Sequence, residues 1–237
     1  MRLSVPIYQL KRQAKRQARQ NNIPLNQALD QVAKAEGFSN WGLLAAFHAR
    51  RKPTAKILDA LRTGDLVLLG ARPGHGKTLM GLELIIEALK EDRHAAFYSL
   101  EYSKRDVENR FSDLGFNSAA KVDKLTVDTS DEICAAYIIE RQHLRPRGSV
   151  AVVDYMQLLD QDRSKPSLEC QVTALKAFAK QAGHILILIS QIDRSYDPQV
   201  RSMPGIGDVR LPNAINLNVF SKTVFLHDGC VQLQKTA

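Results

Sequence analysis

The feature that most constrains this chain is the run GARPGHGKT at residues 70–78. It follows the apolar stretch Asp65–Leu69 and precedes a segment with helical spacing of its apolar residues. A glycine-rich turn between a strand and a helix points backbone N–H groups at an anion. The G-x-x-x-x-G-K-T template expects a glycine at position 71, where this chain has Ala71 directly after Gly70. The context still predicts a phosphate-binding loop.

Strand and helix patterns alternate from residue 64 onward. Short, nearly unbroken apolar runs predict buried strands, and the stretches between them keep a spacing of three to four residues. The predicted strands are Asp65–Leu69, Ala95–Leu100, Lys124–Val127, Val150–Asp154, Ile185–Ser190 and Lys222–Leu226. Ser195–Asn213 is the one long irregular segment, and a loop of that length is usually functional or mobile. We therefore predict an α/β domain with a central, mostly parallel sheet covered by helices on both faces.

The phosphate-binding loop supplies the chemistry of a nucleotide site. Lys77 provides a cation for the β- and γ-phosphates, and Thr78 offers its hydroxyl to Mg²⁺. The residues that we predict to contact nucleotide are Arg72, Pro73, Gly74, His75, Gly76, Lys77, Thr78 and Leu79.

Three polar residues at the ends of other predicted strands complete this prediction. Asp154 ends an apolar run and is the candidate acidic anchor for Mg²⁺, although a carboxylate that simply ends a strand is the alternative. Glu101 is the candidate for orienting an attacking water, or else a first-turn helix carboxylate. Gln191 is a neutral donor suited to sensing the γ-phosphate.

The net charge of +8 belongs wholly to the first fifth of the chain. Residues 1–52 contain ten Lys and Arg against two acidic residues, and the rest of the chain is balanced. We predict a basic helical module at 1–52, a linker at 53–63 and the α/β domain at 64–237. The module should hold three short helices: the first over Tyr8–Gln20, and a third that Ser39 caps and that turns Trp41, Leu44 and Phe47 inward.

The first of these helices has one nearly continuous cationic face. That face favours a polyanionic partner, most simply nucleic acid, over the alternative of a solvated helix surface. The candidate nucleic-acid contacts in this helix are Lys11, Arg12, Lys15, Arg16 and Arg19.

Several classes of protein are disfavoured by composition. No apolar run is long enough for a membrane span, and the first residues lack the apolar core of a secretory signal, so a cytoplasmic location is expected. Cys134, Cys170 and Cys230 are odd in number and far apart, which suggests neither a disulfide framework nor a cysteine zinc site.

Five stretches in order resemble the RecA-like ATPase domain of DnaB-type replicative DNA helicases, over roughly residues 60–227: GARPGHGKT, YSLEYS, VAVVDYMQLL, SLECQVTALKAFAKQA and ISQIDRS. The resemblance implies ATP and Mg²⁺ as ligands, catalysis by Glu101, magnesium support from Asp154 and γ-phosphate sensing by Gln191. It also implies a homo-oligomeric ring, such as a hexamer, with single-stranded DNA in its channel. The loop carrying Arg194, Arg201 and Arg210 would face that channel.

The chain also departs from this family. The helical collar and linker helix are not recognisable, so contact with primase is not implied. The family's closing Lys-x-Arg segment, which reaches a neighbouring subunit's ATP, has no counterpart, because no arginine follows Arg210. The candidate substitutes are Arg194, Arg201 and Arg210 of the long loop, and of these we expect Arg210, because it lies in the part of the loop that still resembles the family.

Two functions follow from these observations. The first is an ATP-dependent DNA motor of the DnaB and RecA class, acting as a helicase or translocase. The alternative is a DNA-binding accessory protein whose assembly is controlled by ATP binding with little hydrolysis. The three polar residues at the strand ends favour the motor, and the basic module and missing Lys-x-Arg favour the accessory protein.

Overall fold

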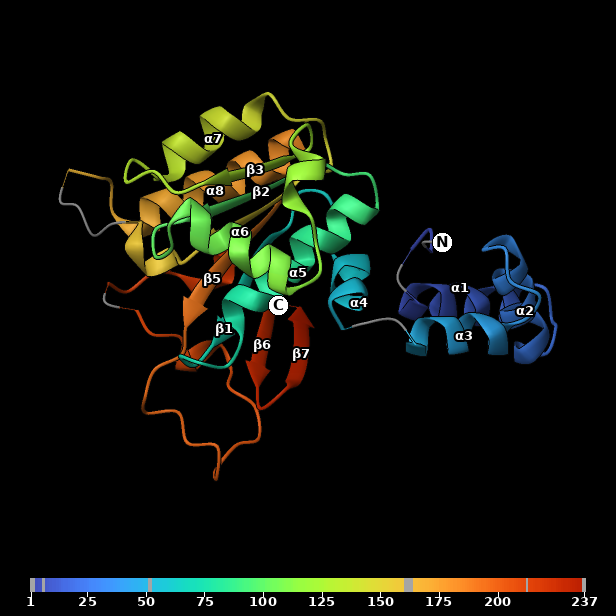
Figure 1. Ribbon diagram of the computed structural model, residues 1–237. Helices are drawn as coiled ribbons and strands as arrows, with labels where there is room; N and C mark the ends of the chain where they lie inside the picture. Colours follow the sequence, from blue (N-terminus) through green and yellow to red (C-terminus); the bar gives the residue numbers. More distant parts are fainter. Residues whose placement is uncertain (1–2, 6, 51–52, 160–163, 212, 236–237) are drawn as a thin grey trace. The chain divides into compact units, whose positions relative to one another are not determined.

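The computed structural model describes residues 3–5, 7–50, 53–159, 164–211 and 213–235. The chain forms two compact units, Met1–Leu61 and Arg62–Ala237. Figure 1 gives the labels of the helices and strands.

The described residues of the first unit form four helices: α1 (Ile7–Gln20), α2 (Leu25–Ala35), α3 (Trp41–Arg50) and α4 (Pro53–Ala60). Its small core contains Leu10 and Ala14 of α1, Val32 of α2 and Leu44 of α3, and Trp41 packs against that cluster. The side chain of Phe47 lies outside the described residues. Helices α1 and α2 thus bury one narrow apolar stripe each and leave their polar sides exposed.

The start of α3 differs from the expected cap at Ser39. Asn40 Oδ1 accepts a hydrogen bond from the backbone N–H of Leu43 at 2.9 Å, and Asp30 Oδ1 accepts one from Trp41 N at 2.8 Å. Asn40 immediately precedes the helix, so its side chain reaches the third residue inside, as an N-cap does. The prediction of Ser39 as the cap was wrong by one residue.

Helix α4 occupies most of the segment predicted as a linker. It begins at Pro53, a residue type that breaks a helix when it lies in the interior. Proline is also favoured at the first position of a helix, because the N–H that it lacks would have no intrahelical partner there. The structure therefore has Pro53 opening a helix.

The second unit is built on a seven-stranded sheet with the order β3-β2-β4-β5-β1-β6-β7. All neighbouring strands are parallel except β6 and β7, which form an antiparallel hairpin. The strands are β1 (Leu66–Ala71), β2 (Ala95–Ser99), β3 (Leu125–Asp128), β4 (Val150–Asp154), β5 (Ile185–Gln191), β6 (Lys222–His227) and β7 (Cys230–Lys235).

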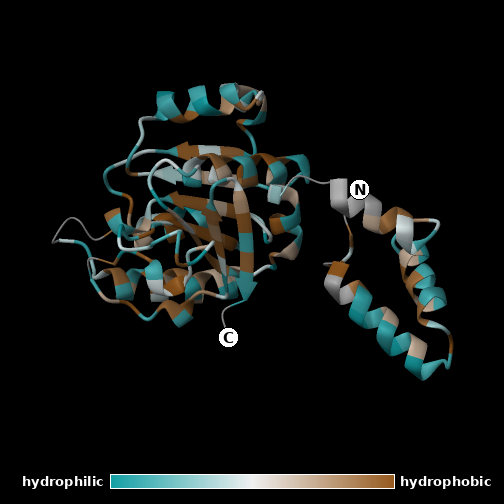
Figure 2. Ribbon diagram, turned by 90° about the horizontal axis from the view of Figure 1, so that it is seen from below, coloured by the Kyte–Doolittle hydropathy of each residue, from teal (hydrophilic) through white to brown (hydrophobic). Residues whose placement is uncertain are grey.

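Helices cover both faces of this sheet. Helices α5 (Lys77–Lys90) and α6 (Lys104–Asp113) pack on one face, and α7 (Ala135–His143) and α8 (Leu168–Ala182) pack on the other. Short 3₁₀ turns lie at Ser118–Lys121, Met156–Leu158, Ile206–Asp208 and Leu217–Val219. Figure 2 shows the strands as mostly hydrophobic and the outer helix faces as hydrophilic. The predicted α/β fold with a mostly parallel, doubly covered sheet is confirmed.

The strand order brings the functional loops together. Strands β4, β5 and β1 are central neighbours, and their carboxyl ends lie at one edge of the sheet. The phosphate-binding loop follows β1, Asp154 ends β4, and Gln191 ends β5. Among the described residues, every helix is too short or too polar to cross a bilayer.

Candidate nucleotide-binding site

The loop between β1 and α5 has the backbone of an anion cradle. Gly74 and Gly76 adopt positive φ of +82° and +81°, a conformation that side-chain-bearing residues rarely take. A Cβ atom at either position would meet nothing within 4 Å, so backbone conformation is what requires glycine there. Gly76 directly precedes α5, so the free N–H groups of the helix lie beside the loop.

Thr78, in the first turn of α5, contacts Asp154 at the end of β4. The Thr78 hydroxyl donates to Asp154 Oδ2 at 2.7 Å, and both residues are buried. This single contact joins the two elements that the sequence predicted to hold Mg²⁺, although 76 positions separate them.

Asp154 is completely buried, and its second oxygen, Oδ1, has no hydrogen-bond partner among the described residues. Burial raises the pKa of this carboxyl from 3.8 to about 6, against the opposing effects of the Thr78 hydrogen bond and the Lys77 charge. A buried carboxylate oxygen without a donor beside a threonine hydroxyl is an oxygen ligand set of the kind that Mg²⁺ uses. These residues fit the predicted metal.

Lys77 and Glu101 lie together above the same edge of the sheet. Lys77 Nζ is 3.9 Å from Glu101 Oε2, and it lies 5.6 Å from the centroid of the Tyr155 ring. The lysine side chain is 9% exposed and the glutamate side chain 35% exposed. A nearly buried ammonium needs an anion, which the Glu101 carboxylate provides here and a phosphate group can also provide.

The backbone around Glu101 is fixed by the end of β2. Ser99 Oγ accepts hydrogen bonds from Glu101 N at 3.2 Å and from Tyr102 N at 2.9 Å. The N–H of Leu100 donates to the Asp154 carbonyl at 2.9 Å. The chain that presents Glu101 is therefore tied to the strand that presents Asp154, which places both carboxylates at one edge.

Gln191 lies where expected, at the end of β5. Its Cα is paired with that of Ala71, the last residue of β1. The Gln191 carbonyl accepts a hydrogen bond from Arg210 N at 2.8 Å. The structure therefore brings the candidate γ-phosphate sensor and Arg210 to the same edge as Lys77.

Gln157 was not predicted from the sequence. Its Nε2 donates to Ser190 Oγ and to the Arg210 carbonyl, both at 2.7 Å, and the side chain is buried. It thus links the end of β4, the end of β5 and the long loop. Only its polar character within VAVVDYMQLL distinguishes it in the sequence, and that signal does not identify a partner.

The long loop after β5 is held by its own contacts. Arg201 Nη2 forms an ion pair with Asp208 Oδ1 at 2.6 Å, and the Tyr196 hydroxyl donates to the Arg201 carbonyl at 2.7 Å. Arg194 and Arg210 are exposed. Arg201 therefore forms an ion pair within the loop, although its side chain is still 54% exposed.

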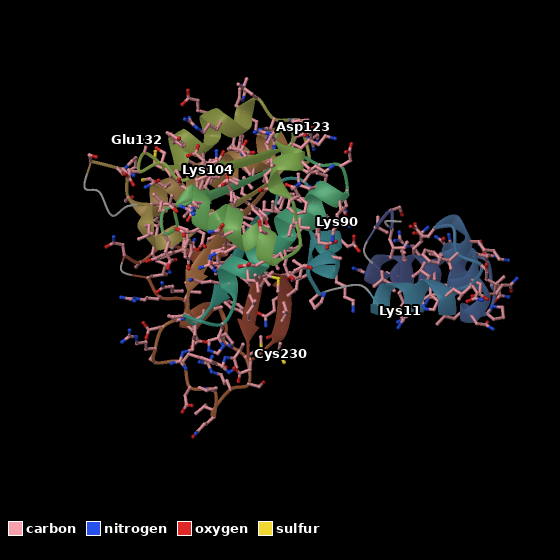
Figure 3. The ribbon with its side chains drawn as sticks, in the orientation of Figure 1. Lys11, Lys90, Lys104, Asp123, Glu132 and Cys230 are labelled. Atoms are coloured by element: carbon pink, nitrogen blue, oxygen red, sulfur yellow. The ribbon has the colours of Figure 1, made fainter. Side chains whose placement is uncertain are left out.

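The five basic residues of α1 are all exposed, while Leu10 and Ala14 on the other side of that helix are buried. Figure 3 labels one of the five, Lys11. The helix therefore presents a cationic surface that is not buried within its own unit.

The comparisons with known proteins bear on this geometry. The family model of the "DnaB-like helicase C terminal domain" matches residues 53–131. Replicative DNA helicase DnaB of Helicobacter pylori strain 26695 is 26% identical over 199 residues, which is 71% of this chain and 41% of the relative. A probable plasmid replicative DNA helicase of Chlamydia muridarum is 24% identical, covering 63% of this chain and 40% of the relative.

Solved structures agree on the fold. One of them, an isolated ATPase domain, superimposes with a TM-score of 0.59 at 20% identity, over 78% of this chain and 81% of that one. A DnaB-like replicative helicase, described with its interactions with primase, gives a TM-score of 0.62 at 20% identity, over 97% of this chain and 71% of that one.

The resemblance to the DnaB-type helicases is confirmed. The second unit, Arg62–Ala237, has the RecA-like fold of their ATPase domains. The chain spans about two fifths of the length of the curated DnaB relatives that it matches. The family match covers the phosphate-binding loop and Glu101, whereas Asp154, Gln191 and the long loop lie beyond residue 131.

Proposed function

We propose that this chain is an ATP-dependent DNA motor of the DnaB class, acting as a helicase or translocase. The observation that supports this most directly is the cluster of Lys77, Thr78, Asp154 and Glu101 at the carboxyl edge of the sheet. Similarity to replicative DNA helicases favours the motor over an accessory protein that binds ATP without turning it over.

Each residue has a distinct part in this proposal. The N–H groups of the phosphate-binding loop and the Lys77 ammonium bind the β- and γ-phosphates. Thr78 and Asp154 hold Mg²⁺, which neutralises charge on the phosphates when bound. Glu101 is partly exposed and orients the water that attacks the γ-phosphate.

The arrangement of Lys77 and Glu101 also suggests that Lys77 holds the Glu101 carboxylate until ATP binds. Their charged groups face each other at 3.9 Å, so an arriving γ-phosphate competes with Glu101 for the ammonium. Binding of the phosphate would release the carboxylate toward water. Gln191, whose Cα is paired with that of Ala71, would sense the γ-phosphate in this proposal.

Two further features extend the proposal to DNA and to assembly. The exposed basic face of α1 and the long loop provide cations for the phosphates of single-stranded DNA. Arg210 is exposed while its backbone is fixed by Gln157 and Gln191. We propose that Arg210 reaches the ATP of a neighbouring subunit in a homo-oligomeric ring.

The test is ATP hydrolysis by the full chain with and without single-stranded DNA, together with its solution mass in the presence of a non-hydrolysable ATP analogue. We expect turnover that DNA stimulates and a mass that increases with the analogue. An intact protein that binds ATP and DNA but gives no turnover above that of Lys77→Ala would contradict the motor and favour the accessory protein.

A further inference from the structure

Three side chains outside the proposed ATPase chemistry converge beside the phosphate-binding loop. His75 belongs to the loop, and His227 and Asp228 lie at the turn between β6 and β7. One potential ligand atom from each lies within 4.8 Å of the other two. In this way the structure joins two segments that are about 150 residues apart in the chain.

The donor atoms face one carboxylate. His75 Nδ1 is 3.5 Å from Asp228 Oδ1, and His227 Nε2 is 3.4 Å from Asp228 Oδ2. Ligands at about 2.0–2.1 Å from a tetrahedral zinc ion are separated from one another by roughly 3.4 Å. Each histidine nitrogen therefore lies at about that spacing from one of the two oxygens of the Asp228 carboxylate.

The two imidazole rings are held in a fixed relation. They stack with centroids 5.0 Å apart and an interplanar angle of 16°, and the edge of the Tyr196 ring packs on His227 at 5.4 Å. The side chain of His227 is 9% exposed, and its Nδ1 has no hydrogen-bond partner among the described residues. The packing therefore holds the His227 ring in place, with Nε2 as the nitrogen that faces Asp228.

The backbone of the hairpin presents the carboxylate. Asp228 and Gly229 both have positive φ, of +46° and +75°, and form the two-residue turn between His227 and Cys230. Asp-Gly is a preferred pair for such a turn. The turn leaves the Asp228 side chain 75% exposed, so an ion from solvent can reach its oxygens.

We propose that His75, His227 and Asp228 form a binding site for a divalent transition metal of the zinc class. Two imidazoles and one carboxylate are a ligand set that zinc uses in proteins, with water as the fourth ligand. Bound metal would tether the phosphate-binding loop to the β6–β7 hairpin. This site goes beyond the proposed ATPase function and does not depend on it.

The experiment is calorimetric titration of the tag-free, nucleotide-free full chain with Zn²⁺, in excess Mg²⁺ so that oxygen-only sites are filled. The absorption spectrum with Co²⁺ reports tetrahedral geometry. The test variants are His75→Gln and Asp228→Asn. Asparagine is chosen at position 228 because it also tolerates the positive φ of the turn. Asp123→Asn, at an exposed turn before β3, is the matched control.

Cys230 needs its own control, because it is exposed and is the cross-strand partner of His227. Figure 3 labels both Cys230 and Asp123. We expect one Zn²⁺ per chain, an affinity lowered about tenfold or more by each test variant, and no change in Asp123→Asn or Cys230→Ser. The proposal would be overturned by the absence of stoichiometric Zn²⁺ binding, or by both test variants binding Zn²⁺ as tightly as the unmodified chain. Loss of binding in Cys230→Ser alone would overturn it as well. Because nucleotide is absent, neither result depends on whether the chain hydrolyses ATP.

Discussion

Replacing Asp154 with asparagine should stabilise the second unit while removing the proposed binding of Mg²⁺ and ATP. Asp154 is completely buried, and its Oδ1 has no partner among the described residues. The carboxylate is therefore held in an unfavourable place for a charge. Asparagine is nearly the same shape, can still accept the Thr78 hydrogen bond and carries no charge.

The size of the effect follows from the raised pKa of Asp154. Its pKa is about 6 in the folded protein against 3.8 for an ordinary aspartate. The folded state therefore binds the proton more tightly than the unfolded state, and stability is lost as pH rises from about 4 through about 6. The ionised carboxylate costs about 3 kcal/mol near pH 8 and roughly half of that near pH 5. The Asn variant avoids that cost.

The assay is equilibrium urea unfolding of the full chain at both pH values, followed by far-ultraviolet circular dichroism. Trp41, the single tryptophan, belongs to the first unit, so its fluorescence is an internal control that should not shift. We expect the Asn variant to be more stable, with a larger gain near pH 8. Equal or lower stability at both pH values, with native circular dichroism, would refute the reasoning about burial.

Three other predictions use the same structure. Lys77→Ala should abolish nucleotide binding, measured with a fluorescent ATP analogue, whereas Lys90→Ala, an exposed lysine at the far end of α5, should bind normally; equal loss in both would indicate a general folding defect. If about four cations of the N-terminal basic module contact phosphates, single-stranded DNA binding should weaken with salt at a log-log slope of roughly −3, and removing residues 1–52 should flatten it. An unchanged slope and affinity would make the module a protein-interaction element. Arg210→Ala should lower turnover by about a thousandfold without weakening ATP binding, and mixing it with Lys77→Ala subunits should restore part of the activity. Brisk hydrolysis by a monomeric Arg210→Ala protein would exclude a role in trans.

Much of the sheet was predictable because its strands are buried on both faces. The runs Val150–Asp154 and Ile185–Ser190 are almost continuously apolar, and β4 and β5 coincide with them to within one residue. Strand β7 was missed because its residues alternate in exposure at the edge of the sheet, and their apolar content is low. The Asp228-Gly229 pair before it is the hairpin signal that could have revealed it.

The candidate site was predictable where one residue type has one chemical task. Lys77, Thr78 and Asp154 were assigned such tasks, and the structure brings the three residues together, while the tasks themselves stay predictions. Gln157 could not be predicted, because its partners Ser190 and Arg210 come from the end of β5 and from the long loop. The contact of His75 with Asp228 depends in the same way on where β6 lies in the sheet, and spacing along the chain carries no information about that.

The central claim is that Glu101 acts on the attacking water at a hydrolytic ATP site. The most direct measurement compares ATP binding with single-turnover hydrolysis in Glu101→Gln, with Glu108→Gln on the exposed side of α6 as the matched control. We expect Glu101→Gln to bind ATP at least as well as the unmodified chain, because the Lys77 ammonium loses a competing carboxylate, and to hydrolyse it at least about a hundredfold more slowly. The Glu108→Gln variant should bind and hydrolyse ATP normally. Unchanged hydrolysis in Glu101→Gln would contradict the account.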